Sequence, residues 1–355
     1  MIKKECFTSE WIKSTAIRNN YKDLNLIEKV IRAMSLLEML KLSGCPFCFK
    51  GGSALMLILG GSASRLSIDI DIICPPGVDI EPYLNGVEKF GFTSMTLEKR
   101  QQRDTNIPKS HSKFFYRVAY KNGDSSSYIL LDVLYEDLQY QAVEEVEIKG
   151  PFIELDGEPL KVIVPSIDDI LGDKLTAFAP KTSGIPYEKG GRDCSLEIIK
   201  QLYDVGRLFE HARNFQRTKD AFTKIGKIEL QYRDIPVELS CIYEDVRETA
   251  LCIATRGQVG KGDFKMLQRG IQKIDSYIYK EKYRIEEAIV DSARAAYLAT
   301  SIEKSQTRIE KYEGDAHSIL DMELSPSVNS KLNKLRKILP EAFFYWVKTS
   351  ELLEE

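Results

Sequence analysis

The chain has 355 residues, of which 43% are hydrophobic and 29% charged, and its net charge is −3. This length favours two domains with sizeable cores, and the charge excludes a protein covered by one basic field, although a local basic patch remains possible. The N-terminal sequence has no apolar signal core, and the longest apolar run, residues 54–59, is far below the ~20 residues of a membrane span. We therefore expect a cytoplasmic protein with no membrane partner.

The N-terminal part predicts a helix, a strand, a second helix and a second strand, in that order. Apolar residues recur at helical spacing over residues 24–40, which predicts an amphipathic helix. A short strand, CPFCFK, then runs into Gly51-Gly52, and Ser53 is expected to open an apolar helix over residues 54–59. Residues 67–74, SIDIDIIC, alternate as a strand does and are followed by two prolines.

Seven scattered cysteines include one CxxC pair, Cys45 and Cys48. No second cysteine pair or histidine pair accompanies it, as a zinc site would require. A redox CxxC is the alternative, but we expect reduced, partly buried thiols.

Two longer strands follow, KFFYRVAY and YILLDVLY, and Asn122-Gly123 between them signals a hairpin. Further short strands are expected over residues 145–164, whereas most of the chain after Leu196 has a helical pattern. We therefore predict an α+β fold. Residues 1–165 would form a small mixed β-sheet with flanking helices, and residues 166–355 an all-helical C-terminal domain that completes the active-site cleft.

Three aspartates lie in apolar strands, where isolated charges are costly. Asp69 and Asp71 are two residues apart, so their carboxylates share one face of a strand and raise each other's pKa unless a cation lies between them. Asp132 is the only charge in YILLDVLY and would be the third carboxylate if the two strands are neighbours. Mg²⁺ prefers such hard oxygen ligands, so the three aspartates predict a magnesium site. The alternatives are a solvated edge strand for the pair and a lysine partner for Asp132.

The junction Lys50-Gly51-Gly52-Ser53 joins a strand to a helix. Glycines allow a positive φ and close approach of the backbone, and a helix N-terminus offers free N–H groups to a phosphate. A tight turn with a serine cap is the plainer alternative. A phosphate cradle together with an acidic metal cluster is what phosphoryl transfer from a nucleotide requires.

The segment FKGGSALMLILGGSASRLSIDIDIIC resembles the nucleotidyltransferase signature, specifically that of the AbiEii-type toxins of abortive-infection, type IV toxin–antitoxin systems. That family has approximately K-G-G-T/S-x-L, followed about a dozen residues later by R-x-S-x-D-x-D. The matching residues are Lys50, Gly51, Gly52, Ser53, Leu55, Arg65, Ser67, Asp69 and Asp71. A later element, KQLYD at residues 200–204, stands where the family has an R-D-L-Y-D-like motif, with Lys200 and Gln201 as departures.

The resemblance implies a role for each candidate residue in the first half of the chain. Gly52 and Ser53 would hold the triphosphate of an NTP, and Asp69 and Asp71 would bind Mg²⁺. Asp132 would activate the attacking hydroxyl. We expect Arg65 to order its loop, although it could reach a phosphate.

The resemblance also implies that Lys174 contacts phosphate or base and that Asp204 orients this lysine; an ordinary solvated ion pair is the alternative. The implied activity is Mg²⁺-dependent transfer of a nucleotide to an acceptor. The implied acceptor is RNA, with the tRNA 3′ end as one candidate, and a cognate antitoxin is a further implied partner. The alternatives are a non-catalytic nucleotide- or RNA-binding module and a metal-dependent nuclease.

Residues 99–121 are rich in basic and aromatic side chains and could hold an RNA backbone. The basic residues are Lys99, Arg100, Arg103, Lys109, Lys113, Arg117 and Lys121, interleaved with His111, Phe114, Phe115 and Tyr116. We favour the alternative, a solvated hairpin whose aromatic side chains point into the core, because the pattern alternates as in a half-buried strand.

Overall fold

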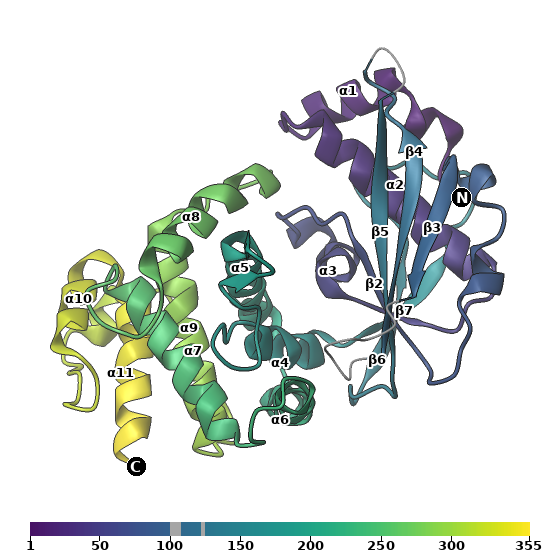
Figure 1. Cartoon of the computed structure of the whole chain (residues 1–355). Helices are drawn as coiled ribbons and strands as arrows, with labels where there is room; N and C mark the ends of the chain where they lie inside the picture. The colour runs from purple at the N-terminus through teal and green to yellow at the C-terminus, as the bar shows by residue number, and fades with distance from the viewer. Residues whose placement is uncertain (100–107, 122–124) are drawn as a thin grey trace. The chain divides into compact units, whose positions relative to one another are not determined.

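The structure is a computed structural model that describes residues 1–99, 108–121 and 125–355 (Figure 1). The predicted hairpin signal at Asn122-Gly123, and Arg100 and Arg103 of the basic stretch, lie outside the described residues. The chain divides into two compact units. The first contains Met1–Ser166 and Ser276–Lys282, and the second contains Ile167–Asp275 and Tyr283–Glu355. The predicted α+β fold class is confirmed.

The first unit contains a five-stranded mixed sheet in the order β1-β2-β5-β4-β3. Its strands are β1 (Cys48–Lys50), β2 (Ile70–Cys74), β3 (Ser94–Lys99), β4 (Lys109–Arg117) and β5 (Ser126–Tyr135). Only the pairing of β2 with β5 is parallel. The strands β6 (Val143–Glu147) and β7 (Lys161–Pro165) form a separate antiparallel pair where further short strands were expected.

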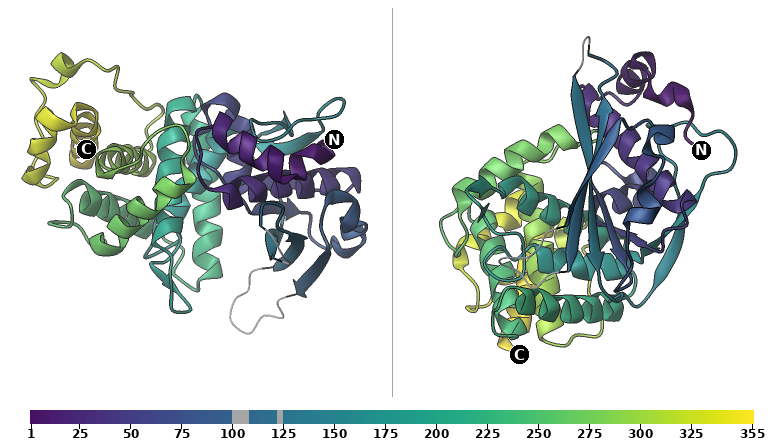
Figure 2. Two further views of the ribbon diagram at one scale, coloured as in Figure 1. Left: turned by 90° about the horizontal axis from the view of Figure 1, so that it is seen from above. Right: turned by 45° about the vertical axis from the view of Figure 1, so that its right-hand side comes forward.

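Three α-helices accompany this sheet: α1 (Ser9–Arg18), α2 (Leu24–Leu42) and α3 (Gly51–Leu59). The apolar stripe of α2, the predicted amphipathic helix, packs into one hydrophobic core with one face of the sheet (Figure 2). Ile70, Ile72, Leu131 and Val133 lie on that face and are at most 1% exposed. Alternation along the strands therefore turns the residues between them, Asp71 and Asp132 included, to the opposite face.

Residues 276–282, here called the strap, belong to the first unit although they follow most of the second in sequence. The Leu66 N–H donates to the Tyr277 carbonyl at 2.8 Å, and the Tyr279 N–H donates to the Ser64 carbonyl at 3.0 Å. These two hydrogen bonds flank an antiparallel bridge between Arg65 and Ile278. The strap thus pairs with the loop that precedes β2, which the sequence did not indicate.

The second unit is helical apart from one short hairpin, β8 (Glu188–Lys189) with β9 (Arg192–Asp193). Its helices are α4 (Ile167–Ala177), α5 (Ser195–His211), α6 (Phe215–Tyr232), α7 (Leu239–Ala254), α8 (Phe264–Ile274), α9 (Ile285–Glu303), α10 (Leu335–Ile338) and α11 (Pro340–Glu354). The division into domains at 1–165 and 166–355 stays a prediction. Within the described ranges, no helix combines the length and the apolar character needed to cross a membrane.

Candidate functional site

Two of the predicted aspartates lie on neighbouring parallel strands. Asp71 of β2 is the register partner of Asp132 of β5, so the expectation that these strands are adjacent is confirmed. Both side chains point away from the core, and the Asp132 side chain is 32% exposed. Asp69, one residue before β2 begins, is exposed. The sheet therefore presents carboxylates on its outer face at the end of β1 and beside the start of α3.

The turn between β1 and α3 brings Asp71 against the helix. Gly51 is the first residue of α3 and has a φ of +78°, which favours glycine. A Cβ atom on Gly51 would lie 2.2 Å from Oδ2 of Asp71, so the carboxylate packs directly on the glycine backbone. An acidic metal-ligand candidate and a helix N-terminus suited to phosphate thus share one place.

Ser53 does not cap a helix that begins at residue 54, as was expected. The helix begins three residues earlier, at Gly51. Ser53 is fully buried, and its hydroxyl donates to the Asp69 carbonyl at 2.6 Å. This hydrogen bond ties the first turn of α3 to the residue that precedes β2. A contact between Ser53 and a triphosphate stays a prediction.

Arg65 lies against the second glycine of the turn. A Cβ atom on Gly52 would meet Nη2 of Arg65 at 2.6 Å and Oγ of Ser67 at 2.8 Å. Arg65 is only 7% exposed, and its Nη1 donates to the Leu66 carbonyl at 3.1 Å. The guanidinium is thus built into the loop and brings positive charge to the first turn of α3. Lys50, the register partner of Asp71, has its Nζ 5.8 Å from the centre of the Tyr140 ring.

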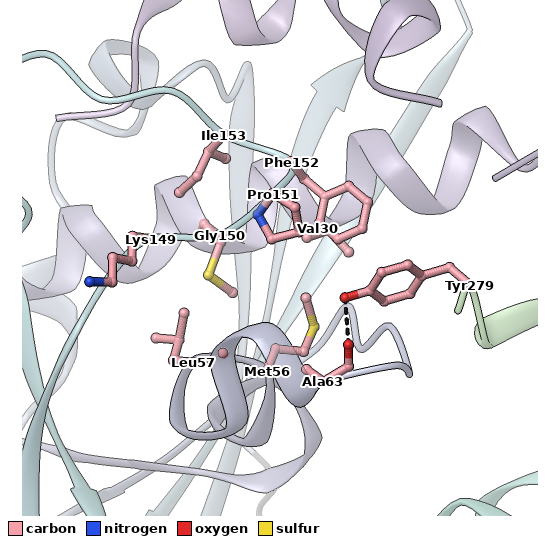
Figure 3. Close-up of a pocket in the computed structure, with 12 residues that line it drawn as sticks. Val30, Met56, Leu57, Ala63, Lys149, Gly150, Pro151, Phe152, Ile153 and Tyr279 are labelled. Carbon is pink, nitrogen blue, oxygen red and sulfur yellow. Dashed lines mark hydrogen bonds between the residues drawn. The ribbon is translucent and has the colours of Figure 1, made fainter. Parts of the chain in front are cut away.

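The strap fixes the loop that carries Arg65. The Tyr279 hydroxyl donates to the Ala63 carbonyl at 2.7 Å, and its ring meets Phe152 edge to face with centroids 5.3 Å apart. Figure 3 shows Tyr279 and Phe152 on one wall of a small apolar pocket, with Met56 and Leu57 of α3 on another. The backbone of the loop between α3 and β2 is thereby held by both main-chain and side-chain groups of the strap.

His111 belongs to the basic and aromatic stretch, and its position beside Asp132 was not predicted. It is the register partner of Asp132 in the antiparallel β4–β5 pair, and its Nδ1 is hydrogen-bonded to Oδ1 of Asp132 at 2.5 Å. The alternative of a lysine partner for Asp132 is therefore replaced by a histidine. Predicting this pair would have required the register between β4 and β5, which the sequence of the two strands does not give.

The carboxylates fit a metal ion that a nucleotide helps to hold. Among the residues that the structure describes, no group of three or more His, Cys, Asp or Glu side chains could hold a metal ion by itself. Mg²⁺ commonly takes one or two carboxylates and completes its shell with water and substrate phosphates. Asp69 and Asp71 offer carboxylates of this kind, and their binding of Mg²⁺ stays a prediction. A carboxylate oxygen of Asp132 is already hydrogen-bonded to His111.

Lys174 and Asp204 form a group of their own in the second unit. Nζ of Lys174 on α4 lies 3.0 Å from Oδ2 of Asp204 on α5, and the two side chains are only 9% and 4% exposed. The alternative of an ordinary solvated ion pair is therefore wrong. The Lys174 ammonium also donates to Oε1 of Gln201 at 2.9 Å, so a carboxylate and a neutral amide together hold the lysine.

The two cysteines of CPFC are free and buried, as expected. Burial raises the pKa of the Cys48 thiol to about 12, which keeps it protonated. A protonated thiol is neither a metal ligand nor a nucleophile. Exchange of Cys48 for serine is accordingly expected to leave the site's chemistry intact.

Comparison with known proteins connects this chain to a family. A family model described as nucleotidyl transferase AbiEii toxin, type IV toxin–antitoxin system, matches residues 35–269, more than half of the chain. The solved structure of JHP933 from Helicobacter pylori is 16% identical, with a TM-score of 0.43, over 78% of this chain and 95% of that one. A second H. pylori structure, described as a candidate nucleotidyltransferase, is 15% identical, with a TM-score of 0.40, over 81% and 97%. No curated protein matches the chain.

Proposed function

This chain belongs to the AbiEii family of nucleotidyl transferase toxins of type IV toxin–antitoxin systems, and on that premise we propose that it transfers a nucleotide from an NTP to RNA with Mg²⁺ as its metal ion. The observation that carries the proposal is the pairing of Asp71 with Asp132 on the outer sheet face, with the Asp71 carboxylate against Gly51 at the start of α3. Acidic ligands and a phosphate-binding helix start are the two parts that nucleotide transfer needs at one place.

In this proposal the backbone N–H groups of the α3 N-terminus bind the triphosphate. Asp69 and Asp71 would hold Mg²⁺, which when bound offsets the negative charge of the phosphates. Asp132 takes the proton of the acceptor hydroxyl, whose oxygen forms a bond to the α-phosphorus as the bond to pyrophosphate breaks. His111 holds the Asp132 carboxylate in place for this proton transfer.

Lys174 has a proposed role as a point charge for phosphate or base, with Asp204 fixing its position. The buried geometry supports this role, because a charged pair in the protein interior costs more to assemble than a solvated one. Of the two side chains that hold the lysine, Asp204 carries a negative charge and Gln201 is neutral.

The test is incubation of the purified chain with Mg²⁺, total RNA and each of the four NTPs in labelled form. Transfer of label to RNA is the expected result, and the NTP that labels best identifies the donor. Shortening of the RNA without label would instead support the nuclease. Nucleotide or RNA binding without any turnover would overturn transfer in favour of a binding module.

Exchange of Asp71 for asparagine keeps the shape of the side chain but removes a charge from the metal site. Transfer is expected to fall by a factor on the order of a hundred or more, because the affinity for Mg²⁺ falls. Thermal melts should show a stable Asp71→Asn protein that has lost most of the wild type's stabilisation by Mg²⁺ and NTP. Asp137→Asn, at an exposed position after β5, is the control and should behave as wild type.

A different pattern of results would show Asp71 to be structural. In that case Asp71→Asn would melt many degrees below the wild type without ligand and yet retain normal transfer.

A further inference from the structure

The outer face of β4 and β5 continues beyond Asp132 as a basic and aromatic surface. Lys113 is the register partner of Leu130, and Phe115 is the partner of Tyr128, on the face that also carries His111 and Asp132. On the opposite face Phe114 and Tyr116 are fully buried, so the expectation of core-facing aromatic side chains is confirmed for these two. It is wrong for Phe115, because adjacent residues of a strand point to opposite faces.

Tyr128 is the centre of this surface, with 42% of it exposed. Its ring lies 5.9 Å from that of Phe115, centroid to centroid, at an interplanar angle of 57°. Two ammonium groups lie near the same ring: Nζ of Lys29 at 5.5 Å and Nζ of Lys113 at 5.8 Å from its centre. An exposed ring beside cations is the arrangement on which single-stranded nucleic acids stack a base while their phosphates meet positive charge.

The geometry of the strand connects this surface to the candidate site. Tyr128, Leu130 and Asp132 follow one another at every second position of β5, so they form a row on one face. At the usual rise of a strand, Tyr128 lies about 13 Å from Asp132 along the row. Leu130, between them, offers an apolar floor. An extended strand of nucleotides that ends at Asp132 would therefore pass over Leu130 and reach the Tyr128 ring.

We propose that Lys113, Phe115 and Tyr128, together called the sheet-face patch, bind the unpaired end of the acceptor RNA. This inference rests on the proposed function and adds to it the path of the acceptor and its single-stranded form. A base stacks on Tyr128, and Lys113 lies near the phosphates. Bases in a duplex are stacked on one another and do not offer their faces, so the patch selects single strands. Stacking is tolerant of base identity, so the patch itself selects little sequence.

The first experiment measures binding of a labelled single-stranded RNA oligonucleotide and of the matching duplex by fluorescence anisotropy. Wild type should prefer the single strand, and Tyr128→Ala should weaken that binding by about five- to 150-fold, the range found for loss of one stacking ring. Tyr128→Phe should retain binding, since it keeps the ring. Tyr312→Ala is the matched control, because Tyr312 forms a similar tilted pair with Phe344 in the second unit. Equal affinity for single strand and duplex, or unchanged binding by Tyr128→Ala, would overturn the inference.

The second experiment separates this inference from the proposed function. In transfer assays Tyr128→Ala should raise KM for the RNA acceptor and leave KM for the NTP unchanged. If wild type transfers nucleotide and Tyr128→Ala has an unchanged acceptor KM, the sheet-face patch is wrong while the proposed function stands. If no RNA is labelled but single strands bind through Tyr128, the proposed function fails and the patch remains.

A charge variant provides the same test without removal of a large side chain. Lys113→Gln should reduce the slope of log affinity against log salt by about 0.7, the value for one phosphate contact to a single strand. An unchanged slope in a Lys113→Gln protein that melts as wild type does would contradict a phosphate contact. If Tyr128→Ala is poorly folded, the salt dependence of Lys113→Gln still tests whether the sheet-face patch binds RNA.

Discussion

Gly51 meets two requirements at once, a positive φ and a backbone against which the Asp71 carboxylate packs. Gly44 meets only the first: its φ is +77°, close to the +78° of Gly51, but a Cβ there would have no atom within 4 Å. Alanine at Gly44 should therefore cost only the backbone strain, about 1 kcal/mol of the free energy of unfolding. Alanine at Gly51 should cost more and should also lower transfer, because Asp71 must move.

Urea unfolding of the two variants gives the difference in stability, and the transfer assay gives the difference in activity. Equal stability of Gly44→Ala and Gly51→Ala, with normal transfer by both, would mean that Asp71 does not depend on contact with Gly51.

His111 is a positioning residue in the proposed mechanism, since it acts through Asp132. Exchange of His111 for alanine should lower kcat on the order of tenfold or more and leave KM for the NTP unchanged, because the carboxylate loses its hydrogen bond but the phosphate site is intact. His111→Gln should recover part of the loss, since its amide can donate to the carboxylate. Exchange of the exposed His317 for alanine is the control. A His111→Ala enzyme with unchanged kcat would remove His111 from the mechanism.

At the scale of elements, alternation and helical periodicity predicted the helices and strands better than the residues at which they begin. The helix expected over residues 24–40 is α2, Leu24–Leu42, and the strand SIDIDIIC contains β2, because both patterns follow directly from which side is buried. The start of α3 was missed because two glycines are poor helix formers, and here contacts with Asp71, Arg65 and Ser67 outweigh that preference.

The partner of Asp132 was not predictable for a related reason. The register of β4 against β5 depends on the connection between them and on which residues face the core. A shift by one residue would have turned His111 towards the core and away from Asp132. Likewise, the strap contacts a loop about two hundred residues earlier, and no local pattern in the sequence carries that information.

Helix α4, which carries Lys174, crosses α6 at a point without room for a side chain. A Cβ on Gly172 would lie 2.5 Å from the Thr218 carbonyl oxygen and 2.7 Å from the Phe222 nitrogen, both of the α6 backbone. Gly172→Ala should therefore lower the free energy of unfolding by several kcal/mol, because the helices must move apart. Gly226→Ala is the control, since its Cβ would meet side chains and no backbone: the flexible tips of Ile242 and Leu239 at 3.0 and 3.1 Å and Cγ2 of Thr176 at 3.7 Å.

Both variants gain about 1 kcal/mol of helix propensity, so the comparison isolates the crossing of α4 and α6. If urea unfolding gave the same free energy of unfolding for Gly172→Ala and Gly226→Ala, the crossing of α4 and α6 would have room for a methyl group.

At the scale of the whole molecule, the strap makes the first unit depend on a distant part of the chain. Arg65 is buried and should resist trypsin in the full chain. Tyr279→Ala removes the hydroxyl that bonds to Ala63 and the ring that packs on Phe152, so the loop opens more often. Mass spectrometry of a timed trypsin digest should show faster cleavage after Arg65 in Tyr279→Ala than in wild type. Lys282→Ala, at the exposed end of the strap, is the control.

Cleavage after Arg65 at the same rate in wild type and Tyr279→Ala would mean that the strap does not hold the loop.

The strap also sets an order of events during synthesis. All the strands of the five-stranded sheet precede Ser166, yet the residues that hold the Arg65 loop are translated more than a hundred positions later. At roughly 5–20 residues per second, this interval lasts on the order of ten seconds. In a ribosome-bound chain, every proposed metal ligand is therefore translated well before the strap that holds the neighbouring loop. Until the strap has been translated, the loop beside the proposed phosphate site of the emerging chain would lack the contacts that hold it.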